Sequence, residues 1–265
     1  KQHGISTPKT YEEVVAASEK IRAAGKMKYP YAAAYKAGWN LAEEFVNMYI
    51  GHGGEFFKSG TATPSINNAK GVATLNMLKK LADLSNPDYL THDSESIKVE
   101  WEAGNVAIMT LWASRAGTLL DAEGDAKITA ATKLVAPATV GGGNIPATTL
   151  WWDGFTLAKN RSDVDAEASF RAMAYAASSK EMAAKAADQA VWLIEGFVPG
   201  PKSVGVIEAV KMGAKPYPML PQMGLMHGAL GNEIVEFLQG NETAEQALKD
   251  VEAAYTSKAK EQGFL

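Results

Sequence analysis

The stretch WEAGNVAIMTL, residues 101–111, joins the end of a short helix to a buried strand. The helix begins at Ser94 and ends at Gly104, and the run from Val106 to Leu111 is apolar with little alternation. A continuous apolar run of this length is typical of a strand buried on both faces, as in a parallel sheet covered by helices. The stretch therefore predicts an α/β layer architecture.

Working outward from this strand, helices outnumber strands. Each helix is expected to begin where a Ser, Thr, Asp or Asn side chain can accept a hydrogen bond from the first turn. Thr10 and Thr243 each precede a Glu or Gln at the third position, which is the capping-box pattern. Asn40 and Asn67 are predicted to cap two further helices. The predicted helices span 10–25, 40–50, 67–82, 94–102, 165–178, 179–189, 203–212, 226–239 and 243–262, and further strands are expected at 133–136 and 148–158.

The composition excludes several classes of protein. The 265 residues are 46% hydrophobic and carry a formal net charge of −4, which argues against binding nucleic acid or an anionic membrane surface. Cysteine is absent, so disulfides, thiolate metal sites and thiol catalysis are excluded. There is no apolar run of about 18 residues to span a membrane, and no signal peptide. The chain opens on Lys1 without an initiator Met, so we expect a processed chain or a piece of a longer one.

No strong catalytic or metal-binding motif is present. The four histidines are not spaced as metal ligands, and no serine-hydrolase elbow or P-loop occurs. Residues 141–143 are three glycines without the Lys and helix start of a phosphate cradle, so they are predicted to form a loop. We expect neither metal nor cofactor. Carboxylates are numerous, and although most lie in first helical turns, a glycosidase-like Asp/Glu pair stays open as an alternative.

The tryptophans are the more informative residues. Trp39, Trp112 and Trp152 each lie at the end of a predicted element beside a polar side chain, namely Asn40, Arg115 and Asp153. An aromatic plate next to a hydrogen-bonding side chain suits a sugar, because the ring covers the C–H face while polar groups address the hydroxyls. Trp101, on the periodic face of its helix, is expected to belong to the core.

Five stretches, in order along the chain, resemble family 1 extracellular solute-binding proteins, the maltodextrin-binding-protein class that serves ABC importers. They are TPKTYEE at 7–13, the glycine pair at 53–54, WEAGNVAIM at 101–109, WWDGFTLA at 151–158 and GNETAEQAL at 240–248. Each motif alone is short, but the five together extend over nearly the whole chain.

The resemblance implies a type II periplasmic-binding-protein fold, with two α/β lobes joined by crossing segments around a ligand cleft. The Thr-Tyr-Glu-Glu helix lies well inside the family's chains but begins near residue 10 here, so most of the N-terminal lobe is expected to lie outside this sequence. Residues 1–147 and 200–265 would form the helix-rich C-terminal lobe. Residues 148–199 would be an excursion into the other lobe, and its apolar side chains would need covering: Leu150, Phe155, Leu157, Phe170 and Met173.

The function that the resemblance implies is capture of a carbohydrate or polyol between two lobes and delivery to the permease subunits of an ABC importer, without catalysis. The protein would be periplasmic or extracellular, tethered to the membrane if at all through a segment outside this chain, and monomeric when complete. Ligand contacts are expected from Trp39, Asn40, Glu43, Trp112, Arg115, Trp152 and Asp153. No histidine is placed in the cleft, so affinity for a neutral sugar is expected to vary little near neutral pH.

Two other classes of function stay open at this point. One is a carbohydrate-active enzyme that uses an Asp/Glu pair. The other is an interaction module whose exposed aromatic side chains bind a polypeptide. Turnover of glycosides would identify the enzyme, and saturable binding without turnover would identify the receptor.

Overall fold

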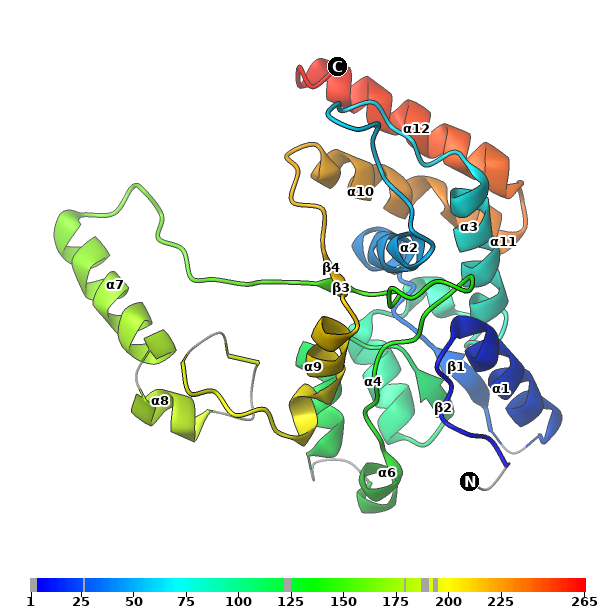
Figure 1. Ribbon diagram of the computed structural model, residues 1–265, viewed down its shortest axis with the longest axis horizontal. Helices are drawn as coiled ribbons and strands as arrows, with labels where there is room; N and C mark the ends of the chain where they lie inside the picture. The colour runs from blue at the N-terminus through cyan, green and yellow to red at the C-terminus, as the bar shows by residue number, and fades with distance from the viewer. Residues whose placement is uncertain (1–3, 26, 122–124, 179, 187–190, 193–194) are drawn as a thin grey trace.

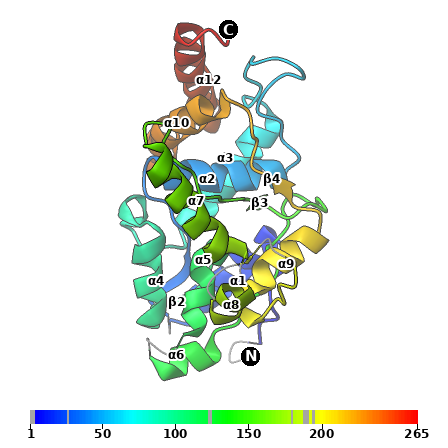
Figure 2. The ribbon, with the colours of Figure 1, turned by 90° about the vertical axis from the view of Figure 1, so that its left-hand side faces the viewer.

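The structure is a computed structural model, and it describes residues 4–25, 27–121, 125–178, 180–186, 191–192 and 195–265. Most of these residues form one body, from which α7 (Asp163–Ser178) and α8 (Lys180–Lys185) stand apart, and an extended segment leads from the body into α7 (Figure 1). The view turned by 90° shows α7 in front of this body (Figure 2).

The main core is helical. It is built where α2 (Trp39–Gly51) packs against α3 (Ala69–Ala82) and α10 (Met223–Glu233), with α12 (Ala244–Glu261) packed on α10 and α3. The apolar face of α1 (Tyr11–Ala23) closes the same core. Its largest fully buried side chains include Tyr49, Tyr255 and Phe45.

Beside this core lies a two-stranded parallel sheet. Strand β1 (Tyr29–Ala32) pairs with β2 (Val106–Met109) in a register that sets Tyr29 opposite Val106 and Tyr31 opposite Ile108. The strand predicted from the 101–111 stretch is therefore present. Strand β1, which the sequence analysis did not predict, supplies its parallel partner. A second, smaller cluster packs beneath the sheet against α4 (Ser94–Glu102) and contains Ala32, Ala34, Ile97 and Val106.

Shorter elements complete this body. They are η1 (Tyr89–Thr91), α5 (Ala113–Ala116), η2 (Gly117–Leu120), α6 (Ala126–Ala131), η3 (Pro201–Ser203), α9 (Val204–Lys211) and α11 (Val235–Gln239). The helix predicted over 226–239 is in fact two, α10 and α11, which meet at Ile234.

The predicted helix caps were right at two of four ends, Thr10 and Thr243, and Asp93 is a cap that the sequence analysis did not name. The side chains of Thr10, Asp93 and Thr243 accept backbone hydrogen bonds from the third residue on. Asn68, not Asn67, caps α3, because its Oδ1 accepts from both Lys70 and Gly71.

Asn40 was wrongly predicted as a cap, because α2 begins one residue earlier, at Trp39. The residue before it is Gly38, whose φ of 93° is one that a glycine adopts readily. The start of α2 is therefore set by the backbone conformation of Gly38, without a side-chain cap hydrogen bond.

The extended segments pair less than predicted. Of residues 148–158, Thr149 and Leu150 alone form a strand, β3, which pairs in parallel with β4 (Lys215–Pro216). Residues 151–158 are exposed, so they have no neighbour with which to form a ladder. Residues 133–136 form no strand either and run over the surface as irregular chain. Part of the helix predicted at 179–189 lies outside the described residues.

The excursion carries bare apolar side chains, as expected. Phe155 and Phe170 are 65% and 60% exposed, Leu157 is also exposed, and Leu150 and Met173 are half-buried. Helix α7 has no buried residue along its 16 positions. A segment with this much exposed apolar surface is unusual in a monomeric soluble protein.

Candidate functional site

Two tryptophans meet at the carboxyl ends of the parallel strands. Trp39 begins α2, which follows β1, and Trp112 lies three residues after the end of β2. Their rings contact edge to face, with centroids 5.4 Å apart. The carboxyl edge of a parallel sheet is where α/β proteins commonly bind ligands.

Two further segments, one after β3 and one after β4, add a third and a fourth ring. Trp151, directly after β3, lies 5.8 Å from Trp39, and Tyr217, directly after β4, lies 4.4 Å from Trp151. We call Trp39, Trp112, Trp151 and Tyr217 the aromatic platform. Trp39 is 50% and Trp151 48% exposed, so the platform presents ring surface to solvent.

A buried carboxylate holds the platform from below. Glu43, one turn into α2, is 2% exposed, and its Oε1 lies 3.1 Å from the Trp151 Nε1 and 2.8 Å from the Thr149 hydroxyl. The Trp151 Nε1 also lies 3.0 Å from the same hydroxyl. The indole of Trp151 is therefore oriented by two partners, one on α2 and one on β3.

A buried histidine forms hydrogen bonds to two residues of the platform on the side away from Glu43. His227 of α10 lies with its Nε2 3.0 Å from the Trp39 carbonyl oxygen and its Nδ1 2.9 Å from the Tyr217 hydroxyl. A carbonyl only accepts, so Nε2 carries the proton and Nδ1 accepts from Tyr217. Burial lowers the pKa of His227, which keeps the ring in this neutral form. One histidine thus ties the start of α2 to the segment after β4.

Two adjacent carboxyl groups on α2 have raised pKa values. Burial raises the pKa of Glu43 to about 7, against the opposing effect of its hydrogen bonds with the Thr149, Trp151 and Asn47 side chains. Burial, with the charge of Glu43 added, raises the pKa of Glu44 to about 8. The site therefore holds acids that can be neutral near physiological pH.

The residues predicted to bind ligand fall into two groups. Trp39, Trp112 and Glu43 come together at the platform, but Glu43 lies beneath Trp151 instead of facing solvent. Asn40 is half-buried beside Trp39. These positions are consistent with the prediction for the two tryptophans, and they give Glu43 a place under the rings.

The remaining predicted residues lie outside the platform. Arg115 is exposed and forms an ion pair with Glu95. Trp152 is 76% exposed and Asp153 is exposed, and neither has a contact with the platform. Successive side chains of an extended segment point to opposite faces, so Trp152 points away where Trp151 points in.

Sequence reasoning missed Trp151, Tyr217 and His227. The expectation that no histidine lies at the site was wrong, because His227 contacts both Trp39 and Tyr217. The sequence did hold a signal for Trp151. Residues 151 and 152 are both Trp, and in an extended segment two adjacent side chains point to opposite faces, so one of the two faces the body. Nothing in the sequence places Tyr217, which lies between two prolines, beside a residue 66 positions earlier.

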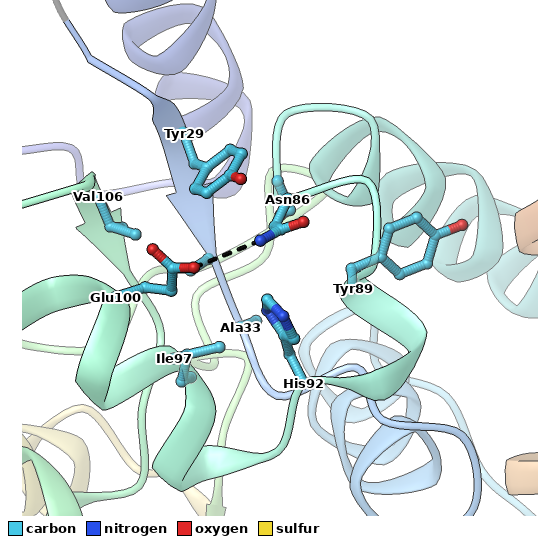
Figure 3. Close-up of a pocket in the computed structure, with 10 residues that line it drawn as sticks. Tyr29, Ala33, Asn86, Tyr89, His92, Ile97, Glu100 and Val106 are labelled. Carbon is cyan, nitrogen blue, oxygen red and sulfur yellow. Dashed lines mark hydrogen bonds between the residues drawn. The ribbon is translucent and has the colours of Figure 1, made fainter.

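A small pocket on another side of the sheet is structural. Asn86 donates to one carboxylate oxygen of Glu100 at 3.4 Å, and His92 lies nearby (Figure 3). Asn105 donates to the other carboxylate oxygen at 2.6 Å. Its free volume of about 10 Å³ is about that of one water molecule. Among the described residues, no three His, Asp or Glu side chains gather as metal ligands.

The fold is that of type II periplasmic binding proteins, and the described part of the chain is rich in helices. The family model described as "Bacterial extracellular solute-binding protein" matches residues 1–183, so the chain belongs to that family. A search of curated protein sequences finds no match. In the part of the chain that the structure describes, no helix has the length and apolarity needed to cross a membrane.

Several solved structures share this fold, and three of them are described with a bound sugar or polyol. A solute-binding protein from Agrobacterium radiobacter K84 in complex with ribitol aligns with a TM-score of 0.77 at 18% identity, covering 96% of this chain and 65% of that one. One from Agrobacterium vitis S4 with D-mannitol gives 0.75 at 17%, covering 99% and 69%. Maltose-bound MalE3 from T. maritima gives 0.73 at 17%, covering 95% and 66%. This chain thus spans 65% of the length of the first of them.

Proposed function

We propose that this protein is the ligand-binding component of an ABC importer and that the aromatic platform binds one face of a neutral saccharide or polyol. The observation that carries the proposal is the cluster of Trp39, Trp112 and Trp151 at the carboxyl ends of the strands, half open to solvent. The ribitol, mannitol and maltose complexes of proteins with this fold support the same class of ligand.

The chemistry of the platform suits such a ligand. The C–H face of a sugar or an extended polyol packs on indole rings, and its hydroxyls need acceptors at the edges of those rings. The uncharged ring surface of Trp39 and Trp151 offers no strong site for an anion. Asn40, half-buried beside Trp39, is the nearest amide that we expect to address a hydroxyl.

The lobe division extends this proposal. We assign residues 1–147 and 200–265 to the C-terminal lobe and 148–199 to an excursion that packs on an N-terminal lobe outside these 265 residues. The bare side chains of Phe155, Leu157 and Phe170 support this assignment, because an apolar partner would cover them. The connection that leaves for the excursion begins at β3, next to Trp151, and β3 pairs with β4, next to Tyr217, so closure of two lobes would bring the second lobe over the platform.

Location and partners follow from the family. Its members are extracellular by description, and we propose a periplasmic or cell-surface protein, monomeric when complete, that docks on permease subunits. If the protein is tethered to the membrane, we expect the tether to be a segment outside this chain. The enzyme alternative is disfavoured because both adjacent acids of α2, Glu43 and Glu44, are buried and do not flank an open site.

Calorimetry on the protein with its complete N-terminal region tests the proposal. Maltose, laminaribiose, D-mannitol and ribitol are titrated, and each mixture is then analysed for unchanged sugar. We expect saturable binding of at least one ligand without turnover, and a loss of at least about tenfold in affinity, roughly 1.4 kcal/mol, in Trp39→Ala and Trp151→Ala.

Two control variants sharpen the result. Trp101→Phe changes a tryptophan outside the platform and should leave affinity unchanged. Trp152→Ala decides whether the second member of the pair contacts ligand from the excursion. Hydrolysis of any disaccharide, or equal affinity in Trp39→Ala and wild type, would overturn the proposal.

A further inference from the structure

The hydroxyl of Thr149 lies between two oxygens. Its Oγ1 is 2.8 Å from the Glu43 Oε1 and 2.7 Å from the Asn47 Oδ1, and both distances are those of O–H···O hydrogen bonds. The Trp151 Nε1 approaches the same Oγ1 at 3.0 Å and can only donate to it. Three hydrogen bonds therefore converge on one threonine oxygen.

With the Oδ1 of Asn47 facing Thr149, a proton count relates the hydrogen bonds of this network to the state of Glu43. A threonine hydroxyl has one proton and can accept two further hydrogen bonds. It cannot donate to both Glu43 and Asn47, and an amide oxygen has no proton to give. If the Glu43 carboxyl is protonated, it donates to Thr149, and Thr149 in turn donates to Asn47. Trp151 fills the second lone pair of Thr149, so every group in the network is then satisfied.

The other oxygen of Glu43 agrees with this count. The Glu43 Oε2 is buried and has no hydrogen-bond partner. Leaving one oxygen of an ionised carboxylate buried and unpartnered costs much more than leaving the carbonyl oxygen of a neutral acid. In the described part of the chain, no ion pair involves Glu43.

We propose that Glu43 is a neutral carboxylic acid in the native protein below neutral pH and acts as the positioning residue for Trp151, so that losing its proton as the pH rises through neutrality releases the indole from its place in the platform. The inference rests on the geometry of the site and does not need the identity of the ligand. It adds to the proposed function a pH dependence that a neutral ligand alone would not produce.

The groups facing Glu43 do not supply a compensating charge. On α2 itself the neighbour is Glu44, a second acid that brings no positive charge. From β4 and α10 come Tyr217 and His227, which bond to each other. Of the lysines on α3, Lys70 bonds to the Gly53 carbonyl, Lys79 bonds to Asp83 and Lys80 is exposed to solvent. Ionised Glu43 would therefore stand without a cation, in line with the rise in its pKa to about 7.

The direct test is the carboxyl ¹³C resonance of Glu43, followed from pH 5 to 9 by NMR on selectively labelled wild-type protein and assigned with Glu43→Gln. We expect the shift of a protonated acid at pH 5 and a single titration with a midpoint near 7. The emission of Trp151, isolated as the signal lost in Trp151→Phe, should move with the same midpoint.

Variants distinguish titration of Glu43 from titration of Glu44 or His227. Glu43→Gln keeps a neutral group that can donate to Thr149, so its Trp151 emission should match wild type at pH 5.5 and stay unchanged to pH 9. Glu44→Gln and His227→Gln should each retain a titration. A Glu43 resonance at the ionised position at pH 5.5, or an unaltered fluorescence titration in Glu43→Gln, would overturn the proposal. Neither readout requires a sugar, so failure of the proposed function would leave this test intact.

Discussion

Replacing Gly231 by alanine tests how the platform is assembled on α10. The Gly231 carbonyl accepts from the backbone N–H of Gly38 at 2.9 Å, and a Cβ at position 231 would lie 2.3 Å from the Gly38 carbonyl oxygen. Gly38 is the entry to α2, directly before Trp39, and His227 lies one turn earlier on α10. The added methyl must therefore separate the two elements that hold Trp39.

The magnitude follows from the contact. Overpacking against rigid backbone costs roughly 1–3 kcal/mol, and the strained Gly38–Gly231 hydrogen bond contributes about 1 kcal/mol more. The better helix propensity of alanine returns up to about 1 kcal/mol. We expect a net loss of roughly 2–3 kcal/mol, which lowers Tm by about 5–10 °C in a protein of this size.

The matched control lies on the same helix. A Cβ at Gly228 meets nothing within 4 Å, so Gly228→Ala should gain about 0.5–1 kcal/mol from helix propensity alone. Urea unfolding monitored by circular dichroism measures both variants, and calorimetry with the ligand found for wild type measures affinity. Gly231→Ala should weaken binding and Gly228→Ala should not. Equal stability of the two variants would refute the packing argument.

Three further outcomes are expected. The native state binds protons more tightly than the unfolded chain at Glu43 and Glu44, so the free energy of unfolding should fall as pH rises from about 5 to 8. The fall should be up to about 1.4 kcal/mol per pH unit for each acid. Urea titrations at several pH values measure this slope, and each Glu→Gln change should remove its share of it. Glu252→Ala removes an oxygen that accepts from the backbone N–H groups of residues 66 and 67, and it should lower the free energy of unfolding by roughly 2 kcal/mol. Glu252→Gln keeps an acceptor oxygen and should lower it less. Equal losses in the two variants would mean that this acceptor does not stabilise the protein. Trp101→Phe should cost about 1 kcal/mol because its Nε1 donates to Thr132, and an unchanged midpoint would show that this bond contributes nothing.

The helical part of the fold could be predicted because its signals are local. A capping side chain and the polar residues of the next turn lie within four positions of each other, and Thr10, Ser94 and Thr243 mark their helices correctly to within one residue. The strand at 106–109 was predictable for the same reason, since a buried strand carries its own apolar run. The boundary at Gly38 was missed because a positive φ replaces the side-chain cap that the pattern requires.

Strand pairing and the candidate site depend on contacts between residues distant in sequence, so less of them could be predicted from the sequence. Residues 148–158 have the composition of a long strand, yet they pair over two positions because no further neighbour lies beside them. The platform joins residues 39, 112, 151 and 217, and the presence of Trp39 and Trp112 could be anticipated from their places at element ends. Trp101, predicted to be core, is partly buried against the smaller cluster and holds a hydrogen bond at the surface.

Fluorine NMR of protein labelled with 5-fluorotryptophan tests the central claim, that ligand binds on the platform. The six tryptophans give six resonances, each assigned by a Trp→Phe variant, and the protein is titrated with maltose, then with D-mannitol. We predict saturable shifts of Trp39, Trp112 and Trp151 with one common Kd, while Trp101 and Trp192 stay in place. Saturable binding that moves Trp101 or Trp192 and leaves the three platform resonances unshifted would contradict the account.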